Sequence, residues 1–161
     1  QLQVLDYAIL VVSGADGVQG HTRTLWNLLA RYQVPTFIFI NKMDQDGTDR
    51  QDRLTELKRK LSGECVDFTE AGEEFLEELS MCDETVMESY LENGEITASQ
   101  IQTLIRERKV FPCYFGSALK LEGVQELLDG LEKYRAKIGG HDASSVPMSV
   151  SSPLSSGYGM L

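Results

Sequence analysis

An amide, a lysine and a carboxylate stand at the end of one apolar run in the sequence. Residues 36–40 form the run, and Asn41, Lys42 and Asp44 follow it. A carboxylate accepts from two N–H groups, an amide both donates and accepts, and a lysine stem offers an apolar surface. A guanine base requires these groups, so we expect guanine as the ligand. Turn formation or helix capping after a strand is the alternative interpretation of the same residues.

A second apolar run, residues 110–115, ends at the small residues Gly116, Ser117 and Ala118. Small residues in that turn would let backbone N–H groups approach a purine oxygen closely, which a bulky residue would prevent. Both runs are almost continuously apolar, as in parallel strands that are buried on both faces. Because parallel sheets hold ligands at the carboxyl ends of their strands, we expect the two loops to contribute to one site.

The apolar pattern predicts an α/β fold of three layers, with three parallel strands near residues 7–12, 36–40 and 111–116 and helices on both faces. His21 lies near the start of the first expected helix. No second catalytic partner accompanies it, so we expect a surface or capping residue.

Another helix is expected after Thr48, which forms a capping-box pattern with Gln51. Its apolar stripe comprises Leu54, Leu57 and Leu61. The basic residues of this segment lie mainly off the stripe and are expected to form a solvated face: Arg50, Arg53, Lys58, Arg59 and Lys60.

The segment between the two loops is acidic. Twelve Asp and Glu residues and no Lys or Arg lie between positions 64 and 95. Apolar residues still recur there at helical spacing, which predicts an amphipathic helix over 70–92 within a helical insertion at about 64–109. Metal binding is the alternative for so many carboxylates, but no calcium-loop pattern is present. Thr97 and Gln100 form a capping box for a further helix.

Composition limits the classes of function. The chain has 161 residues, 42% of them hydrophobic, which suffices for one domain with a core. A net charge of −10 and a pI near 4.6 argue against direct nucleic-acid binding. No apolar run reaches the length of a membrane span and no signal-like segment opens the chain, so we expect no membrane partner and a cytoplasmic location.

Two further features concern the cysteines and the last residues. Cys65, Cys82 and Cys113 are widely spaced and odd in number, which favours reduced thiols over a zinc site or a disulfide framework. Residues 139–161 are rich in Ser, Gly and Pro and are expected to form a flexible tail.

Three segments together resemble a known family. They are Asp6 to Thr22, the Phe-Ile-Asn-Lys-Met-Asp segment at 39–44, and Gly-Ser-Ala at 116–118. In this order they resemble the C-terminal half of the GTPase domain of translational GTPases, most closely elongation factor G and the ribosomal protection proteins of tetracycline resistance. The resemblance implies a partial GTP-binding domain at 1–138, with a partial P-loop-GTPase-type sheet that retains three strands.

The resemblance also implies roles for individual residues. Asp44 would bind the guanine N1 and N2 hydrogens, Asn41 would contact N7 and brace the loop, and the Lys42 stem would lie over the ring. Ser117 would support that loop while the Ala118 N–H met O6. The implied guanine-binding set is Asn41, Lys42, Asp44, Ser117, Ala118 and Leu119, with no catalytic residue and no metal ligand.

The sequence contains no match to the phosphate-binding Gly-x-x-x-x-Gly-Lys-Ser/Thr loop, the magnesium-binding switch threonine or the Asp-x-x-Gly segment of such GTPases. We therefore expect the guanine-recognition half of a GTP-binding domain, which binds GTP or GDP weakly by itself and does not hydrolyse GTP. Magnesium and the ribosome would be partners only of a full-length parent. The insertion is short beside the extra subdomain typical of elongation factor G, which favours a protection-type or release-factor-type relative.

Two other expectations concern protein partners. The alternative function is a non-catalytic interaction module that uses the acidic helix at 70–92. In addition, the strand at 7–12 would pair in the family with a strand upstream of Gln1, so we expect self-association through this strand.

Overall fold

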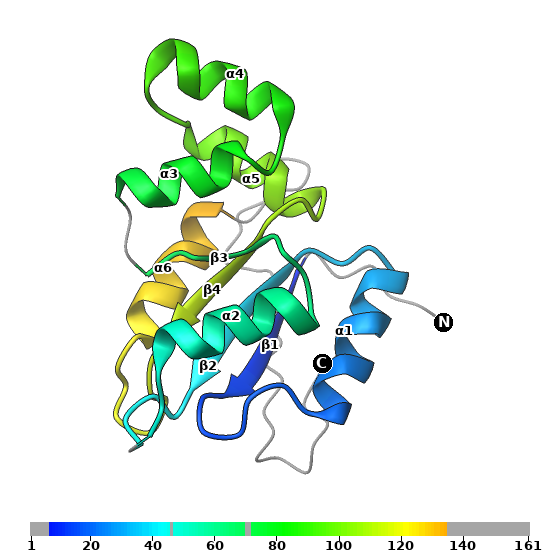
Figure 1. Ribbon diagram of the computed structural model, residues 1–161, viewed down its shortest axis with the longest axis vertical. Helices are drawn as coiled ribbons and strands as arrows, with labels where there is room; N and C mark the ends of the chain where they lie inside the picture. The colour runs from blue at the N-terminus through cyan, green and yellow to red at the C-terminus, as the bar shows by residue number, and fades with distance from the viewer. Residues whose placement is uncertain (1–6, 46, 70–71, 135–161) are drawn as a thin grey trace.

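A parallel sheet of four strands forms the centre of the computed structural model, which describes residues 7–45, 47–69 and 72–134 (Figure 1). The strands are β1 (Ala8–Ser13), β2 (Thr36–Asn41), β4 (Phe111–Phe115) and β3 (Cys65–Asp67), in that spatial order. All three pairings are parallel. The predicted α/β fold is confirmed, and the three expected strands are joined by a fourth, β3, which was not expected from the sequence.

Every residue of β1, β2 and β4 is buried, as expected for strands covered on both faces. Successive side chains of a strand point to opposite faces, so alternate residues enter different cores. Ile9 and Val11 belong to one apolar cluster, whereas Leu10 and Val12 belong to another.

Helices cover both faces of the sheet and complete three layers. On one face α1 (Gly20–Arg31) and α2 (Arg50–Lys60) contribute Trp26, Leu54 and Leu57 to the cluster around Leu10. On the other face α3 (Glu73–Ser80), α5 (Ala98–Arg106) and α6 (Val124–Tyr134) contribute to the cluster around Ile9. Figure 1 shows these helices with α4 (Glu84–Asn93), which lies at the end of the molecule opposite the carboxyl edge of the sheet.

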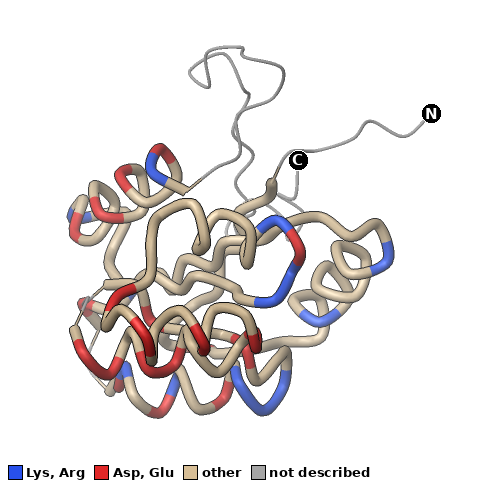
Figure 2. The backbone as a smooth tube through the Cα atoms, turned by 90° about the horizontal axis from the view of Figure 1, so that it is seen from above, with Lys and Arg blue, Asp and Glu red and all other residues tan. Residues whose placement is uncertain are grey.

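The acidic insertion contains two helices where one was expected over 70–92, so that prediction is wrong in its detail. The chain leaves the helix at Met81, the C-cap of α3, and α4 begins after Asp83. The Asp83 carboxylate accepts hydrogen bonds from the backbone N–H groups of Thr85 and Val86, at 3.1 and 3.3 Å. A capped helix start of this kind fixes a new helix axis. Acidic residues lie along the insertion helices (Figure 2).

Caps elsewhere were predicted with mixed success. Thr97 and Gln100 form the expected capping box at the start of α5. The expected box of Thr48 with Gln51 is wrong, because Asp49 is the N-cap of α2 and accepts from the Asp52 N–H at 3.1 Å. The Thr48 hydroxyl instead donates to the carbonyl of Met43 at 3.1 Å.

The predictions for residues 1–6 and for the tail at 139–161 fall outside the described residues. Within the described ranges, no helix combines the length and apolar character needed to cross a membrane.

Candidate functional site

The two predicted loops lie side by side at the carboxyl edge of the sheet. Ile40 pairs with Phe115 at the ends of β2 and β4. Beyond that pair, the Gly116 N–H donates to the Ile40 carbonyl and the Met43 N–H donates to the Gly116 carbonyl, both at 3.0 Å. The main chains of the two loops are therefore fixed relative to each other by hydrogen bonds in both directions.

Asn41 is the last residue of β2 and connects three loops. Its side chain is buried, and its Oδ1 accepts a hydrogen bond from the Ala118 N–H at 2.8 Å. Its backbone carbonyl accepts from the Gly14 N–H at 2.7 Å. Because Oδ1 is engaged with Ala118, the side-chain amide NH₂ is the group that Asn41 can direct to a ligand.

Asp44 lies beside the second loop. A hydrogen bond from the Ser117 side chain lowers the pKa of Asp44, and the charge of Lys120 acts in the same direction. The Lys120 ammonium lies 3.8 Å from Asp44 Oδ2, and the Asp44 side chain is 18% exposed. The carboxylate is therefore ionised at neutral pH, oriented by a neutral hydroxyl, and still reachable from solvent.

The remaining predicted residues border the same edge. Lys42 has a φ of 62°, which is uncommon for a residue with a side chain. It lines a small cavity of about 150 Å³ with Ser13, Asp16 and Thr22. Leu119 is 90% exposed, in the turn that follows Ala118.

The turn after β4 depends on glycine. Ser117 and Glu122 exchange backbone hydrogen bonds of 2.8 and 2.9 Å, which close the loop. A Cβ atom on Gly116 would lie 2.0 Å from the carbonyl oxygen of Glu122, so no larger residue fits without moving the main chain. The small-residue turn expected from the sequence therefore has a close backbone approach as its cause.

Arg53 is a residue of this edge that the sequence analysis assigned to a solvated face, and that assignment is wrong. Its guanidinium Nε and Nη2 donate to the Gly14 carbonyl at 3.0 and 2.8 Å. Arg50 also departs from the expectation, since it stacks over the Phe115 ring at 5.0 Å and pairs with Asp67. One signal in the sequence could have indicated that these arginines are partly buried: on a helix both lie next to the apolar stripe of Leu54 and Leu57.

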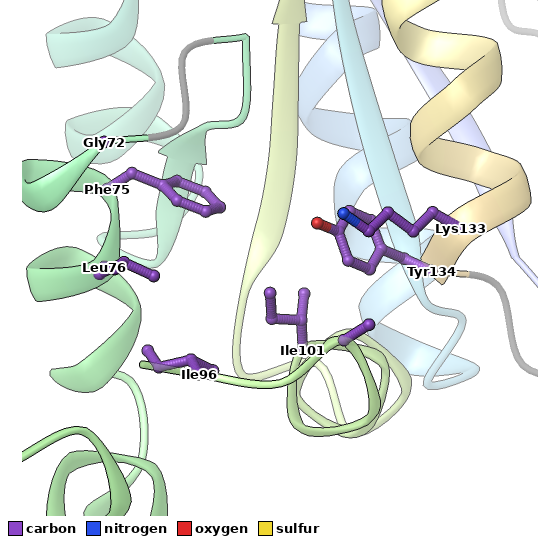
Figure 3. Close-up of a pocket in the computed structure, with 8 residues that line it drawn as sticks. Gly72, Phe75, Leu76, Ile96, Ile101, Lys133 and Tyr134 are labelled. Carbon is purple, nitrogen blue, oxygen red and sulfur yellow. The ribbon is translucent and has the colours of Figure 1, made fainter. Parts of the chain in front are cut away.

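Two other features lie apart from this edge. Among residues 7–45, 47–69 and 72–134, no group of three or more His, Cys, Asp or Glu side chains could hold a metal ion. A hollow of about 250 Å³ lies between α3, α5 and α6, lined mainly by Phe75, Leu76, Ile96 and Ile101 (Figure 3). None of the predicted site residues lines it.

The sequence profile of the elongation factor Tu GTP-binding domain family matches residues 1–137. The sheet and the loop pair at its carboxyl edge therefore belong to a GTP-binding domain. The chain is a member of the elongation factor Tu GTP-binding domain family, within the translational GTPases.

Two relatives are tetracycline resistance proteins. TetW from Butyrivibrio fibrisolvens is 34% identical over 146 residues, which cover 81% of this chain and 23% of TetW. TetP from Clostridium perfringens is 31% identical over 156 residues, which cover 83% of this chain and 24% of TetP.

Elongation factor G 2 from Geobacter metallireducens is 28% identical over 183 residues, which cover 83% of this chain and 27% of the factor. That alignment is longer than the 161 residues of this chain, so the elongation factor carries additional residues inside the aligned region. The chain spans about a quarter of the length of each of these relatives.

A crystal structure of a protein from Thermus thermophilus has a similar fold. Its TM-score is 0.71 at 21% sequence identity, and the match covers 83% of this chain and 27% of that chain. The arrangement of strands and helices is therefore one already seen in a solved protein.

Proposed function

We propose that this chain is the guanine-recognition part of the GTP-binding domain of a ribosome-associated translational GTPase, of the elongation factor G or tetracycline ribosomal protection type. The observation that carries the proposal is that the loops at 41–44 and 116–118 are joined by hydrogen bonds. Asn41 bonds to Ala118, and Asp44 lies against Ser117, at the carboxyl edge where parallel sheets bind ligands.

Each residue has a role in this proposal. Asp44 accepts from the guanine N1–H and N2–H groups, and the Lys42 stem and Leu119 contact the ring. Asn41 directs its NH₂ to N7. The Ala118 N–H, now bonded to Asn41, turns or divides its hydrogen bond to reach O6. The Ser117 side chain donates to Asp44, which lowers the pKa of the carboxylate and orients it.

The 161 residues alone are proposed to bind GTP or GDP weakly and not to hydrolyse GTP. Base recognition without a phosphate loop provides a few hydrogen bonds, each contributing about 0.5–3 kcal/mol, against an association cost of at least about 4 kcal/mol. A dissociation constant on the order of a millimolar or weaker follows. Magnesium, the ribosome and a cytoplasmic location are proposed for the full-length parent.

A nuclear magnetic resonance titration tests the proposal directly. The ¹⁵N-labelled chain is titrated with GDP and, in parallel, with ADP. Guanine recognition predicts that the amide signals of Asn41 and Ala118 respond to GDP and not to ADP. Equal responses to the two nucleotides would rule out a guanine site at these loops.

The Asp44→Asn variant tests the assignment of the carboxylate. The exchange replaces one acceptor by a donor opposite the guanine N1–H, so we expect GDP to bind more weakly by on the order of tenfold and xanthosine diphosphate to bind better. Asp129→Asn, on the exposed side of α6, is the matched control and is expected to change neither. An Asp44→Asn chain that still preferred GDP to xanthosine diphosphate would contradict the assignment.

The second candidate function is a protein-interaction module that uses α3 and α4. Exposed apolar side chains among the acidic residues favour it: Met81 and Leu91 are each 77% exposed. The same GDP titration separates the two functions, because an interaction module alone predicts no guanine-specific response at Asn41 and Ala118.

Self-association through β1 remains a prediction. Among the described residues β1 is an edge strand of the sheet, so one side of its backbone is open to pairing with a second copy. A sedimentation profile that stays monomeric at high micromolar concentration would contradict it.

A further inference from the structure

A chain of hydrogen bonds runs from the loop at 41–44, here called the base-recognition loop, through Gly14 to helix α2. The Gly14 N–H donates to the Asn41 carbonyl at 2.7 Å. The Gly14 carbonyl in turn accepts from Arg53 Nε and Nη2, at 3.0 and 2.8 Å. The Arg53 guanidinium is therefore linked to the backbone of Asn41 through Gly14.

The same guanidinium is itself fixed by Glu56, one turn further along α2. Arg53 Nη1 pairs with Glu56 Oε1, while Glu56 Oε2 accepts from the Val18 N–H at 3.3 Å and from the Lys60 ammonium at 3.0 Å. The side chains of Arg53 and Glu56 are 20% and 14% exposed. Burial raises the pKa of Glu56, but hydrogen bonds from Arg53 and Lys60 outweigh it and leave the pKa below its ordinary value.

Two glycines make this approach possible. Gly17 has a φ of 77°, and a Cβ there would lie 2.3 Å from Arg53 Nη1. A Cβ on Gly14 would lie 2.6 Å from Met43 Sδ and 2.8 Å from the Asn41 carbonyl oxygen. The loop at 14–18 is thus packed between the Arg53 side chain and the base-recognition loop.

We propose that Arg53 and Glu56 are positioning residues of the guanine site, which hold the loop at 14–18 against Asn41 and so fix the amide of Asn41 beside Ala118. The proposal rests on the proposed function and adds to it two residues outside the recognition loops. The contact with Asn41 is indirect: Arg53 and Glu56 bond to Gly14 and Val18, and Gly14 bonds to the Asn41 carbonyl.

The guanidinium shape is the essential property. Its planar fork presents donors in fixed directions, so Arg53 bonds a carbonyl with one edge and a carboxylate with another. A lysine ammonium carries the same charge but lacks this fixed geometry. A loop released from Asn41 would bind the base less well, because it would have to be ordered on binding.

Hydrogen exchange of the nucleotide-free chain tests the positioning role. Arg53→Met is compared with Arg59→Met, an exposed arginine on the same helix. We expect exchange at the Gly14 and Ala118 amides, both bonded to Asn41, to accelerate about tenfold in Arg53→Met alone, while core amides such as that of Leu10 keep their rates. Equal acceleration at all amides, or none at Gly14 and Ala118, would overturn the proposal.

Nucleotide binding and the conservative variant complete the test. The initial GDP response at Asn41 and Ala118 should fall by on the order of fivefold in Arg53→Met and remain unchanged in Arg59→Met. Arg53→Lys should show the same loss of GDP response as Arg53→Met. A wild-type response in Arg53→Lys would show that charge alone suffices and that the planar guanidinium geometry is not required. If the wild-type chain answers GDP and ADP alike, the proposed function fails, and the exchange comparison still decides whether Arg53 holds the loop.

Discussion

The loops at the carboxyl edge of the sheet and the acidic insertion differ in what holds them in place. Hydrogen bonds hold the loops: Asn41 accepts from Ala118, and Gly116 exchanges bonds with Ile40 and Met43. Apolar burial holds the insertion, since Leu79 is fully buried in the cluster that contains β1 and β2 residues. Helix α4 contributes only Val86 to the buried set among the described residues.

This difference determines how each region tolerates change. A hydrogen bond requires a donor and an acceptor at a fixed distance and angle, so the loops depend on particular residues and on backbone position. Apolar burial is non-directional and depends mainly on area and volume. The insertion should therefore accept many substitutions on its outer surface, and the loops few.

The largest expected effect comes from removing the anchor of the insertion. Leu79→Ala should lower the free energy of unfolding by about 3 kcal/mol, because it leaves a cavity in a shared core. Leu91→Ala, at a side chain that is 77% exposed, should change it by less than about 0.5 kcal/mol. Urea denaturation measures both. Similar losses in the two variants would show that α4 is buried against something and would remove the contrast with the loops.

A pair of glycine substitutions tests the loops against the insertion. Gly116→Ala places a Cβ against the Glu122 carbonyl and the Gly123 Cα, both main-chain atoms, so we expect a loss of about 2 kcal/mol in unfolding free energy. At Gly94 an added Cβ would have open space around it, so only the positive φ of 76° opposes an alanine there. Gly94→Ala should therefore lower the unfolding free energy by about 1 kcal/mol.

The two glycine variants should also differ in where they act. Gly116→Ala is expected to shift the amide signals of Met43 and Ala118, whereas Gly94→Ala should leave both unchanged. If Gly116→Ala were as stable as the parent chain, the close approach at this turn would not be needed for the loop.

Much of the fold could be predicted from the sequence, because β1, β2 and β4 are continuous apolar runs with clear ends. Helix α5 was found from its capping box for the same reason, since the signal is local. Strand β3 was missed because Cys65–Asp67 is only three residues long and shows no pattern of its own. It becomes a strand by pairing with Phe111 and its neighbours in β4.

The break between α3 and α4 was missed for a different reason. Leu79, Cys82 and Val86 keep helical spacing across it, so periodicity continues where the helix does not. Asp83 before an apolar-periodic segment is a capping signal that could have shown the break.

The site residues show the same difference between local sequence signals, which can be predicted, and long-range contacts, which cannot. The loops at 41–44 and 116–118 could be predicted, since the residues of each are adjacent in sequence. The contact of Arg53 with Gly14 could not, because its partner is a main-chain carbonyl 39 residues away, and any residue type supplies a carbonyl.

The smallest expected effect concerns two carboxylates, one in each region. A hydrogen bond from Ser117 lowers the pKa of Asp44, and a hydrogen bond from Lys109 lowers the pKa of Asp83. The Lys109 ammonium lies 2.7 Å from Asp83 Oδ1, and its side chain is 43% exposed. Both folded-state pKa values lie below the ordinary 3.8, so each carboxylate contributes stability that is present above that pH and is lost as the pH falls through the folded-state pKa.

The two shifts should respond differently to salt. Ser117 is neutral, so its effect on Asp44 should persist at about 1 M salt, where the screening length falls to about 3 Å. The Lys109–Asp83 pair is an exposed ion pair, so the pKa of Asp83 should rise towards 3.8 under the same conditions. Carboxyl ¹³C titrations at low and high salt measure both values. Ser117→Ala should raise the pKa of Asp44 alone, and Lys109→Met that of Asp83 alone. Equal salt dependence of the two carboxylates would mean that the charge of Lys120, and not the hydrogen bond from Ser117, lowers the pKa of Asp44, so that the loop at 41–44 would depend on charge as well as on directional hydrogen bonds.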